Sequence, residues 1–265
     1  MYNITVTIKQ ILNDLTIHQL DGLVVLEFVV QKDRTWVLAH DDYELTAKQQ
    51  QKFEQLVKRR VSGEPLAYII GTKEFYGYDF YVTKDVLVPR PDSEAFLDLL
   101  DDYKPLPGQS LIDVGTGSGA LGISTKIAYP FLQVTASDLS NKALLVAKKN
   151  AAQLNADVKF VRSDLFSNID FKYDYIFANL PYVPTNFDVS EEVLSEPSIA
   201  VFSGQDGLDC IKAFIPQATQ HCNKLGYVFI ESLKIQHKKV KDLANNYNLK
   251  LVNTTNLVQV YQKTN

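Results

Sequence analysis

The second half of the chain alternates short apolar runs with segments of helical spacing, and this pattern constrains the fold more than any other feature. From Ser110 onward, runs of strand length are followed by segments that fit helices. Strands joined in this way pair in parallel, so the pattern predicts an α/β fold. The expected strands are Leu111 to Val114, Gln133 to Ser137, Val158 to Val161, Tyr173 to Ala178 and Gly226 to Glu231, followed by an antiparallel pair near Lys250 to Val252 and Leu257 to Gln262.

The N-terminal part has a helical pattern instead. Apolar residues recur at three- and four-residue spacings in Ile4 to Leu15, His18 to Val30 and Thr46 to Val61, with polar breaks between these segments. A small helical domain is therefore predicted for residues 1–71.

A short alternating segment separates the two patterns. Around Glu74 to Val82, apolar Phe75 and Phe80 alternate with turn-forming and polar residues, which favours a β-hairpin. A new helix is expected soon afterwards, with Asp92 or Ser93 as its N-cap. The predicted organisation is a β-hairpin linker over residues 72–91 and an α/β domain over residues 92–265.

Length and charge limit the possible functions. The chain has 265 residues, which suits two domains, and a net charge of −4, which gives no general electrostatic reason to bind nucleic acid. The longest apolar stretches are too short for a membrane span and the N-terminus lacks a signal pattern, so a cytoplasmic protein is expected. The basic stretch Lys48 to Arg60 is a local exception that fits either a solvated helix face or a docking patch.

The cysteine and histidine positions do not predict a metal site. Cys210 and Cys222 lack further cysteines at ligand spacing, and the histidines do not complete a set with them. The pair His221-Cys222 fits the end of a helix. No metal is therefore expected.

A glycine-rich loop, Asp113 to Gly119, follows the first predicted strand and leads into a helix. Glycines at alternate positions let the backbone turn sharply and approach a ligand, and a helix N-terminus offers free N–H groups. Asp138 ends the second strand, where a carboxylate of a doubly wound fold binds ribose hydroxyls. These features predict a nucleoside-bearing cofactor. Gly117 to Gly122 also matches a nicotinamide-binding motif, but nothing downstream supplies the groups that hydride transfer needs.

The corner Asn179-Leu180-Pro181-Tyr182 follows the strand that ends at Ala178. Two acceptors, the side-chain oxygen of Asn179 and the carbonyl of Leu180, can hold the two N–H bonds of a planar amide or amine. Pro181 keeps that carbonyl turned toward the pocket, and Tyr182 offers an aromatic face. Because Asn is neutral and no base, the proton released on transfer should pass to solvent. The corner predicts methyl transfer to nitrogen.

The acid before the glycines, the G-x-G-x-G spacing and the Asn-x-Pro-Tyr corner together resemble S-adenosylmethionine-dependent methyltransferases. The resemblance implies S-adenosyl-L-methionine as cofactor, with Asp113 orienting the loop or the cationic amino group. Asp164 would accept from the adenine amino group and Leu165 or Phe166 would cover the ring, although Asp164 also fits a simple turn. The expected cofactor-binding residues are Asp113, Gly115, Thr116, Gly117, Ser118, Gly119, Asp138, Asp164, Leu165 and Asn179.

A closer resemblance covers nearly the whole chain. The chain resembles the peptide chain release factor glutamine methyltransferases, the HemK/PrmC family. The resemblance implies a Rossmann-like methyltransferase domain, an N-terminal helical bundle that recognises the partner, and methylation of the glutamine in the Gly-Gly-Gln loop of class I release factors, with no direct nucleic-acid partner. The matching stretches are Arg59-Arg60, Gly63 to Pro65, Tyr68 to Gly71, Val88 to Glu94, Asp113 to Gly119, Asn179 to Tyr182, Glu196-Pro197 and Gly204 to Leu208.

Two departures from the family pattern leave alternatives open. Leu180 stands where the family has proline, which adds a backbone N–H that needs a partner. The resulting Asn-Leu-Pro-Tyr is also similar to the motif of ribosomal RNA adenine dimethyltransferases, so a nucleic-acid adenine methyltransferase is the main competitor. A catalytically weakened cofactor-binding protein is a further alternative. The second departure is Glu231-Ser232-Leu233, where the family tends to have Glu, an apolar residue and Gly.

Overall fold

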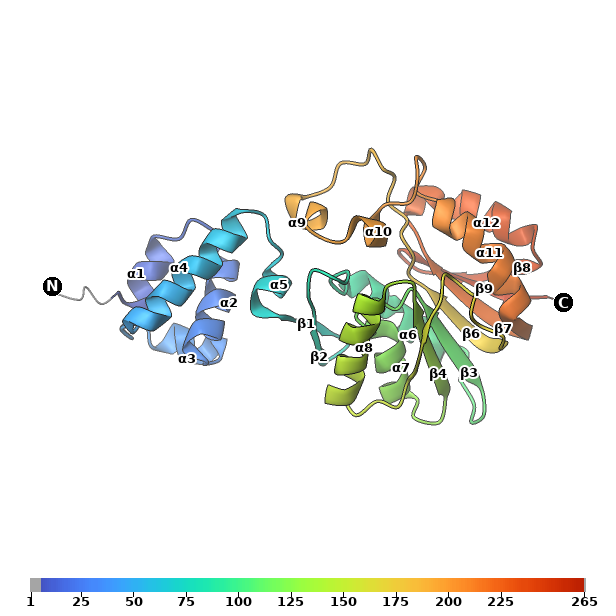
Figure 1. The fold of residues 1–265 in the computed structure, drawn as a ribbon, viewed down its shortest axis with the longest axis horizontal. Helices are drawn as coiled ribbons and strands as arrows, with labels where there is room; N and C mark the ends of the chain where they lie inside the picture. Colours follow the sequence, from blue (N-terminus) through green and yellow to red (C-terminus); the bar gives the residue numbers. More distant parts are fainter. Residues whose placement is uncertain (1–5, 265) are drawn as a thin grey trace. The chain divides into compact units, whose positions relative to one another are not determined.

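A seven-stranded sheet organises the larger part of the chain (Figure 1). The computed structural model describes residues 6–264. The strand order is β5-β4-β3-β6-β7-β9-β8, in which β3 to β7 run parallel and β9 is antiparallel to both of its neighbours. The predicted parallel strands and the final antiparallel pair are thereby confirmed. The strands are β3 (Ser110–Val114), β4 (Gln133–Asp138), β5 (Lys159–Arg162), β6 (Tyr173–Ala178), β7 (Cys222–Glu231), β8 (Leu249–Thr254) and β9 (Val258–Lys263).

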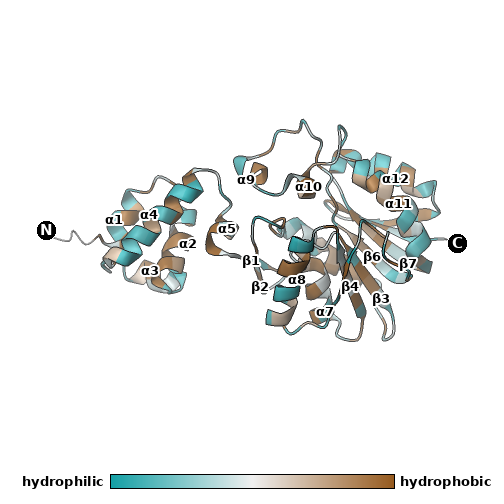
Figure 2. Cartoon of the chain, viewed as in Figure 1, coloured by the Kyte–Doolittle hydropathy of each residue, from teal (hydrophilic) through white to brown (hydrophobic). Residues whose placement is uncertain are grey.

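Helices cover both faces of this sheet because alternate side chains of the strands enter two separate cores. On β6, Tyr175 and Phe177 belong to the core beneath α6 and α7, whereas Ile176 and Ala178 belong to the core beneath α11 and α12. Figure 2 shows the hydrophobic colour concentrated on the central strands. The helices of this part are α6 (Ala95–Asp101), α7 (Ala120–Ala128), α8 (Asn141–Gln153), α10 (Ser198–Val201), α11 (Asp209–His221) and α12 (His237–Asn245), with short 3-10 turns η1 (Pro91–Glu94) and η2 (Lys234–Gln236).

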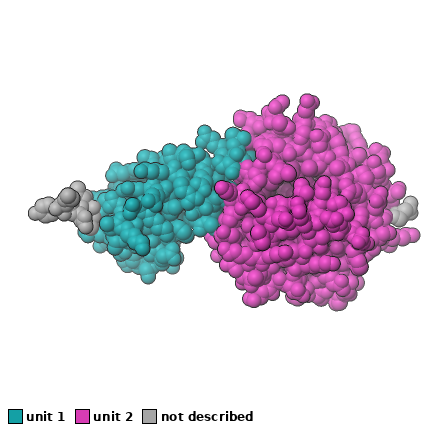
Figure 3. All heavy atoms as spheres, in the orientation of Figure 1, with its two compact units in different colours: residues 1–71, 190–195 teal, residues 72–189, 196–265 magenta. Residues whose placement is uncertain are grey.

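The chain divides into two units (Figure 3). The first consists of the residues up to Gly71 together with Ser190–Ser195, and the second begins at Thr72 and resumes at Glu196. The short insertion carries α9 (Glu191–Leu194), and nothing in the linear pattern predicted that it would join the helical unit. Within this unit Glu192 accepts a hydrogen bond from Arg60.

The first unit is helical, as predicted. The described part of the predicted helix Ile4 to Leu15 is α1, and the helices expected at His18 to Val30 and Thr46 to Val61 are α2 and α4. Thr46 caps α4 through a reciprocal pair of hydrogen bonds with Gln49. Two short helices, α3 and α5, were missed because each is too brief to show a periodic pattern. The helices are α1 (Ile8–Asn13), α2 (Gln19–Val30), α3 (Arg34–Ala39), α4 (Ala47–Val61) and α5 (Leu66–Ile70).

Two of the basic residues in Lys48 to Arg60 are paired with acids of the same unit. Arg59 Nε donates to Glu64 Oε2 at 2.7 Å, and Arg60 Nε donates to Asp21 Oδ2 at 2.6 Å. Because both guanidinium groups are paired with acids, the stretch offers less free positive charge than its sequence indicates.

The predicted hairpin is present as β1 (Thr72–Phe75) and β2 (Tyr78–Tyr81), an antiparallel pair that buries Phe75 and Phe80. The expected N-cap, however, was wrong. Pro91 begins the 3-10 turn η1, and α6 follows directly. The N-cap residue of α6 is Glu94, whose side chain makes no capping hydrogen bond. The Ser93 hydroxyl instead bonds to groups far away in the sequence, so it is not available to cap the helix. Among the described residues, no helix is long and apolar enough to cross a membrane.

Candidate active site

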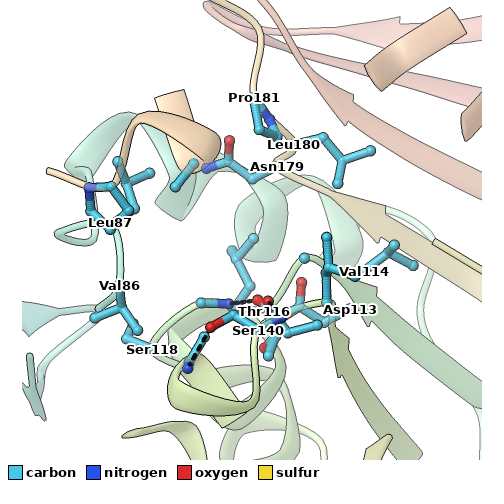
Figure 4. A pocket seen from close by; sticks show the side chains of 18 of the residues that line it. Val86, Leu87, Asp113, Val114, Thr116, Ser118, Ser140, Asn179, Leu180 and Pro181 are labelled. Atoms are coloured by element: carbon cyan, nitrogen blue, oxygen red, sulfur yellow. Dashed lines mark hydrogen bonds between the residues drawn. The ribbon is translucent and has the colours of Figure 1, made fainter. Parts of the chain in front are cut away.

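A cavity of about 500 Å³ lies at the carboxyl ends of the parallel strands (Figure 4). The segments that follow β3, β4, β5 and β6 meet there because parallel strands end at the same edge of the sheet. Gly119 and Tyr182 are the two predicted site residues that do not line it. The predicted residues that do are Asp113, Gly115, Thr116, Gly117, Ser118, Asp138, Asp164, Leu165, Asn179, Leu180 and Pro181.

The glycine loop is fixed by hydrogen bonds to the neighbouring strand. The N–H groups of Gly115 and Thr116 both donate to the Ser137 carbonyl at 2.9 Å. Gly119 has a φ of 86°, and a Cβ there would lie 2.6 Å from Ile123 Cδ1. Glycine is therefore needed at 119 both for the backbone conformation and for close packing of the loop on α7.

Asp113 ties the loop to the start of α7. Its Oδ2 accepts from Thr116 Oγ1 at 2.6 Å and from the Gly122 N–H at 3.0 Å. Burial raises the pKa of this carboxyl to about 6, although both hydrogen bonds oppose the rise. Asp113 was expected to orient either the loop or the cationic amino group of the cofactor, and these two hydrogen bonds show that it orients the loop.

Asp138 holds two backbone segments at the end of β4. Its Oδ2 accepts from the Gly117 N–H at 2.9 Å and its Oδ1 from the Ser140 N–H at 2.8 Å. Burial raises the pKa of the carboxyl, and these two bonds lower it. A carboxylate has about four lone-pair positions, so this arrangement leaves acceptor capacity for ligand hydroxyls.

The segment after β5 divides its side chains between the cavity and the core. Leu165 lines the cavity with a φ of 47°, and exposed Asp164 lies beside it. Phe166 points the other way, where its ring stacks on His221 with centroids 4.5 Å apart. Of the two residues expected to cover a ring, only Leu165 is therefore in position. His221 is the last residue of α11, which confirms its expected place at the end of a helix.

The predicted corner begins where β6 ends. The amide Nδ2 of Asn179 donates to Ser93 Oγ at 2.8 Å, and this is the side chain's single hydrogen bond to the described part of the chain. Its oxygen is directed toward Pro181 and away from the glycine loop (Figure 4). Asn179 thus presents an unused acceptor beside the cavity.

The side chain of Leu180 has a packing role that the sequence did not reveal. It is 6% exposed, belongs to the core beneath α11, and also lines the cavity. A Cβ on Gly115 would lie 2.9 Å from Leu180 Cδ2, so the leucine covers the glycine loop closely. The Leu180 N–H has no hydrogen-bond acceptor within residues 6–264.

Tyr182 does not present its ring to the cavity, contrary to the prediction. Its hydroxyl donates to Glu231 Oε1 at 2.8 Å, and its carbonyl accepts from Gln236 Nε2 at 2.8 Å. Burial and the nearby Glu231 carboxylate raise the pKa of the hydroxyl far above its usual range. Tyr182 therefore anchors the corner from behind.

The segment after the corner is clamped by residues 201–207. The Val183 N–H donates a hydrogen bond to the Val201 carbonyl at 3.0 Å, and the Val183 carbonyl accepts one from the Ser203 N–H at 2.9 Å. A Cβ on Gly207 would overlap the Tyr182 carbonyl oxygen. This contact explains why glycine occupies a position to which the sequence assigned no role.

Two further pairs at the site escaped sequence reasoning. Buried Glu196 accepts from the Val88 N–H at 3.0 Å and from Arg90, which lines the cavity. Buried Glu231 accepts from Ser93 Oγ at 2.7 Å. The available signal was the specific match of the Val88 to Glu94 and Glu196-Pro197 stretches to one family, which marked Arg90, Ser93 and Glu196 without giving them a chemical role. Glu231 had stood out only within a departure from the family pattern. Within the described residues, no group of three or more His, Cys, Asp or Glu is placed to hold a metal ion.

The fold and the site together define the class of protein. The model of the methyltransferase small domain matches residues 91–261, and the PrmC N-terminal domain matches residues 7–71. A methyltransferase structure from Pyrococcus furiosus covers 83% of this chain and all (100%) of its own, with 16% identity and a TM-score of 0.56. The 16S rRNA N2 G1207 methyltransferase of T. Thermophilus, in complex with AdoMet and guanosine, has the same identity and TM-score over 73% of this chain and 50% of its own. The chain is an S-adenosylmethionine-dependent methyltransferase, which removes the nicotinamide alternative.

Curated relatives narrow the class to a family. The release factor glutamine methyltransferase of Koribacter versatilis is 38% identical over 80% of this chain and 78% of its own length. That of Coxiella burnetii is 34% identical over 85% of this chain and 82% of its own. The chain belongs to the release factor glutamine methyltransferase family, which confirms the resemblance found in its motifs.

We expect Gly207→Ala to destabilise the protein more than the matched substitution Gly77→Ala. Both glycines have positive φ, 74° and 79°, so both substitutions carry a backbone cost of about 1–2 kcal/mol. A Cβ at 207 would also strike the Tyr182 backbone, whereas no heavy atom lies within 4 Å at 77. Urea unfolding should show a further loss of about 2 kcal/mol for Gly207→Ala. Equal losses in the two variants would contradict the clamp.

Asp113→Asn should change how stability depends on pH. The folded-state pKa of Asp113, about 6, lies above its ordinary value of 3.8, so the folded state binds more protons between these values. This group therefore lowers stability as pH rises through that window, by up to about 3 kcal/mol. The free energy of unfolding of Asp113→Asn, minus that of the wild type, should increase from pH 4 to pH 7. A difference independent of pH would show that Asp113 does not titrate in this way.

Proposed function

We propose that this protein transfers a methyl group from S-adenosyl-L-methionine to the side-chain amide nitrogen of the glutamine in the Gly-Gly-Gln motif of class I peptide chain release factors. The observation that carries the proposal is the orientation of Asn179. Its Nδ2 is bonded to Ser93, which leaves its oxygen as an acceptor beside the cavity, and the carbonyl of Leu180, which also lines the cavity, is assigned as the second acceptor. A primary amide has two N–H bonds, which these two acceptors match.

The cofactor fits the residues that line the cavity. Asp138 retains lone pairs for ribose hydroxyls. The lining residues Gly115 to Ser118 are assigned to the methionine end of the cofactor, and the lining residues Asp164 and Leu165 to its adenine. Asp113 is bonded through Oδ2, so its Oδ1 is available to a cationic amino group. The bound cofactor supplies an electrophilic methyl group on a sulfonium.

The residues of the corner orient the substrate rather than activate it by proton removal. Asn179 and the Leu180 carbonyl would each accept a hydrogen bond from one N–H of the amide, which would raise electron density on the nitrogen and orient its lone pair for attack on the methyl group that the bound cofactor would supply. Pro181 restricts the backbone that carries the Leu180 carbonyl. Asn179 cannot accept a proton at neutral pH, so the proton released from the amide passes to solvent.

We assign partner recognition to the helical part, residues 1–71, with the hairpin 72–91 as linker and residues 92–265 as the transfer domain. A protein partner is favoured over nucleic acid by the net charge of −4 and by the pairing of Arg59 and Arg60 with acids. The relatives' shared name, release factor glutamine methyltransferase, supports the same substrate. A cytoplasmic location is part of this proposal because translation termination occurs there.

The substrate is tested by incubating the protein with labelled S-adenosylmethionine and either a class I release factor or ribosomal RNA. Mass spectrometry of the digested release factor should find one methyl group on the Gly-Gly-Gln glutamine, and the RNA should remain unlabelled. Label in RNA adenine would replace this proposal with the nucleic-acid alternative. Cofactor binding without transfer to either substrate would favour a binding module weakened at Leu180.

Asn179→Ala should slow methyl transfer by about 10²–10³-fold, because one oriented acceptor is lost from the transition state. Cofactor affinity measured by calorimetry should change little, since the loop and Asp138 remain. The matched control is Asn245→Ala, an exposed asparagine at the end of α12, which should keep the wild-type rate. An Asn179→Ala rate equal to that of the control would overturn the mechanism.

A further inference from the structure

A buried carboxylate, Glu231, connects three segments of the transfer domain at the edge of the sheet. It ends β7, whose Ile230 pairs with Ala178 of β6, so Glu231 and Asn179 leave the sheet on neighbouring strands. Glu231 is 1% exposed. Its two oxygens accept from Ser93 Oγ at 2.7 Å and from the Tyr182 hydroxyl at 2.8 Å.

The direction of these hydrogen bonds determines which atom of the Asn179 amide faces Ser93. Both oxygens of Glu231 accept hydrogen bonds from hydroxyl groups, and one of these bonds uses the single proton of the Ser93 hydroxyl. Ser93 Oγ can then only accept from Asn179, which must offer its NH2 group, as observed at 2.8 Å. The Asn179 oxygen is consequently turned to the opposite side.

We propose that Ser93 and Glu231 are positioning residues that fix the amide of Asn179 in the one orientation that presents its oxygen to the substrate. The inference rests on the proposed function of Asn179 as an acceptor for the substrate N–H. If the Asn179 amide turned over, its NH2 group would face the substrate N–H, and two donors would oppose one another. The Tyr182 hydroxyl donates to the other carboxylate oxygen of Glu231. Ser93 is therefore the residue through which Glu231 acts on the orientation of Asn179.

The surroundings of Glu231 support a functional role for this buried acid. Burial raises the pKa of the carboxyl, and Asp92 adds to the rise, while the bonds from Ser93 and Tyr182 and the charge of Arg90 oppose it. A buried carboxylate costs stability unless donors satisfy it. Here its oxygens receive hydroxyl donors from both neighbouring segments, and one of these donors is the group that contacts Asn179.

A double-mutant cycle separates positioning from a general structural effect. In single-turnover measurements with saturating cofactor and release factor, Ser93→Ala should slow methyl transfer about tenfold or more. The dissociation constant of the cofactor should stay within about twofold of the wild-type value, because Ser93 acts on Asn179, which is assigned to the substrate nitrogen. In the Asn179→Ala background, Ser93→Ala should change the rate less than about twofold, since the group it orients is absent.

Glu231→Gln provides a second variant of nearly unchanged shape. Its amide can donate as well as accept, so the Ser93 proton is no longer forced toward position 231. The rate should fall about fivefold or more in the wild-type background, and by less than about twofold when Asn179 is already alanine.

The matched control is Ser124→Ala, which removes a fully buried hydroxyl of α7 that has no hydrogen-bond partner among residues 6–264; its transfer rate should equal that of the wild type. A wild-type rate in Ser93→Ala, or an equal loss with and without Asn179, would overturn the inference. If Asn179→Ala itself transfers methyl at the wild-type rate, the acceptor role of Asn179 fails and the positioning role with it, whereas the proposed function fails if the wild-type protein transfers no methyl to the release factor. If Asn179→Ala is slow while Ser93→Ala is normal, only the positioning role fails.

Discussion

The parallel pairing of β3 to β7 is the constraint on which the site depends. Because these strands end at one edge of the sheet, segments far apart in the sequence leave it as neighbours. The glycine loop follows β3, Asp138 ends β4, Asn179 follows β6 and Glu231 ends β7. No pair of these groups is local in sequence, and all of them meet around one cavity or directly behind it.

Around that edge, the structure has two layers of polar groups with different tasks. Asp113 bonds to the Thr116 hydroxyl of the glycine loop and to the Gly122 N–H of α7, and Asp138 bonds to the Gly117 N–H, so these two acids hold the wall of the cavity in place. Behind the corner, Glu231 accepts hydrogen bonds from the hydroxyls of Ser93 and Tyr182. The first layer shapes the cofactor site and the second orients the acceptor for the substrate. Such fixed polar groups contribute to catalysis because they need not reorganise as the reaction proceeds.

Local patterns in the sequence predicted the elements and the residues that follow strand ends, because strand alternation and glycine loops are encoded within short windows. They failed where a side chain's partner is distant. Ser93 was expected to cap α6, but its hydroxyl bonds to Glu231, 138 residues away. Tyr182 was expected to offer its ring to the substrate, but its hydroxyl bonds to the same acid. Likewise, the close packing over Gly115 of Leu180, which departs from the family pattern, is a contact visible only in space.

The central claim is that Asn179 and the Leu180 carbonyl together hold the two N–H bonds of a primary amide. A crystal structure of the complex with S-adenosylhomocysteine and a class I release factor tests it most directly. The glutamine amide nitrogen should lie about 3 Å from both Asn179 Oδ1 and the Leu180 carbonyl oxygen, with Asn179 Nδ2 still bonded to Ser93. A glutamine amide bonded to other groups, or an Asn179 oxygen turned toward Ser93, would contradict the account.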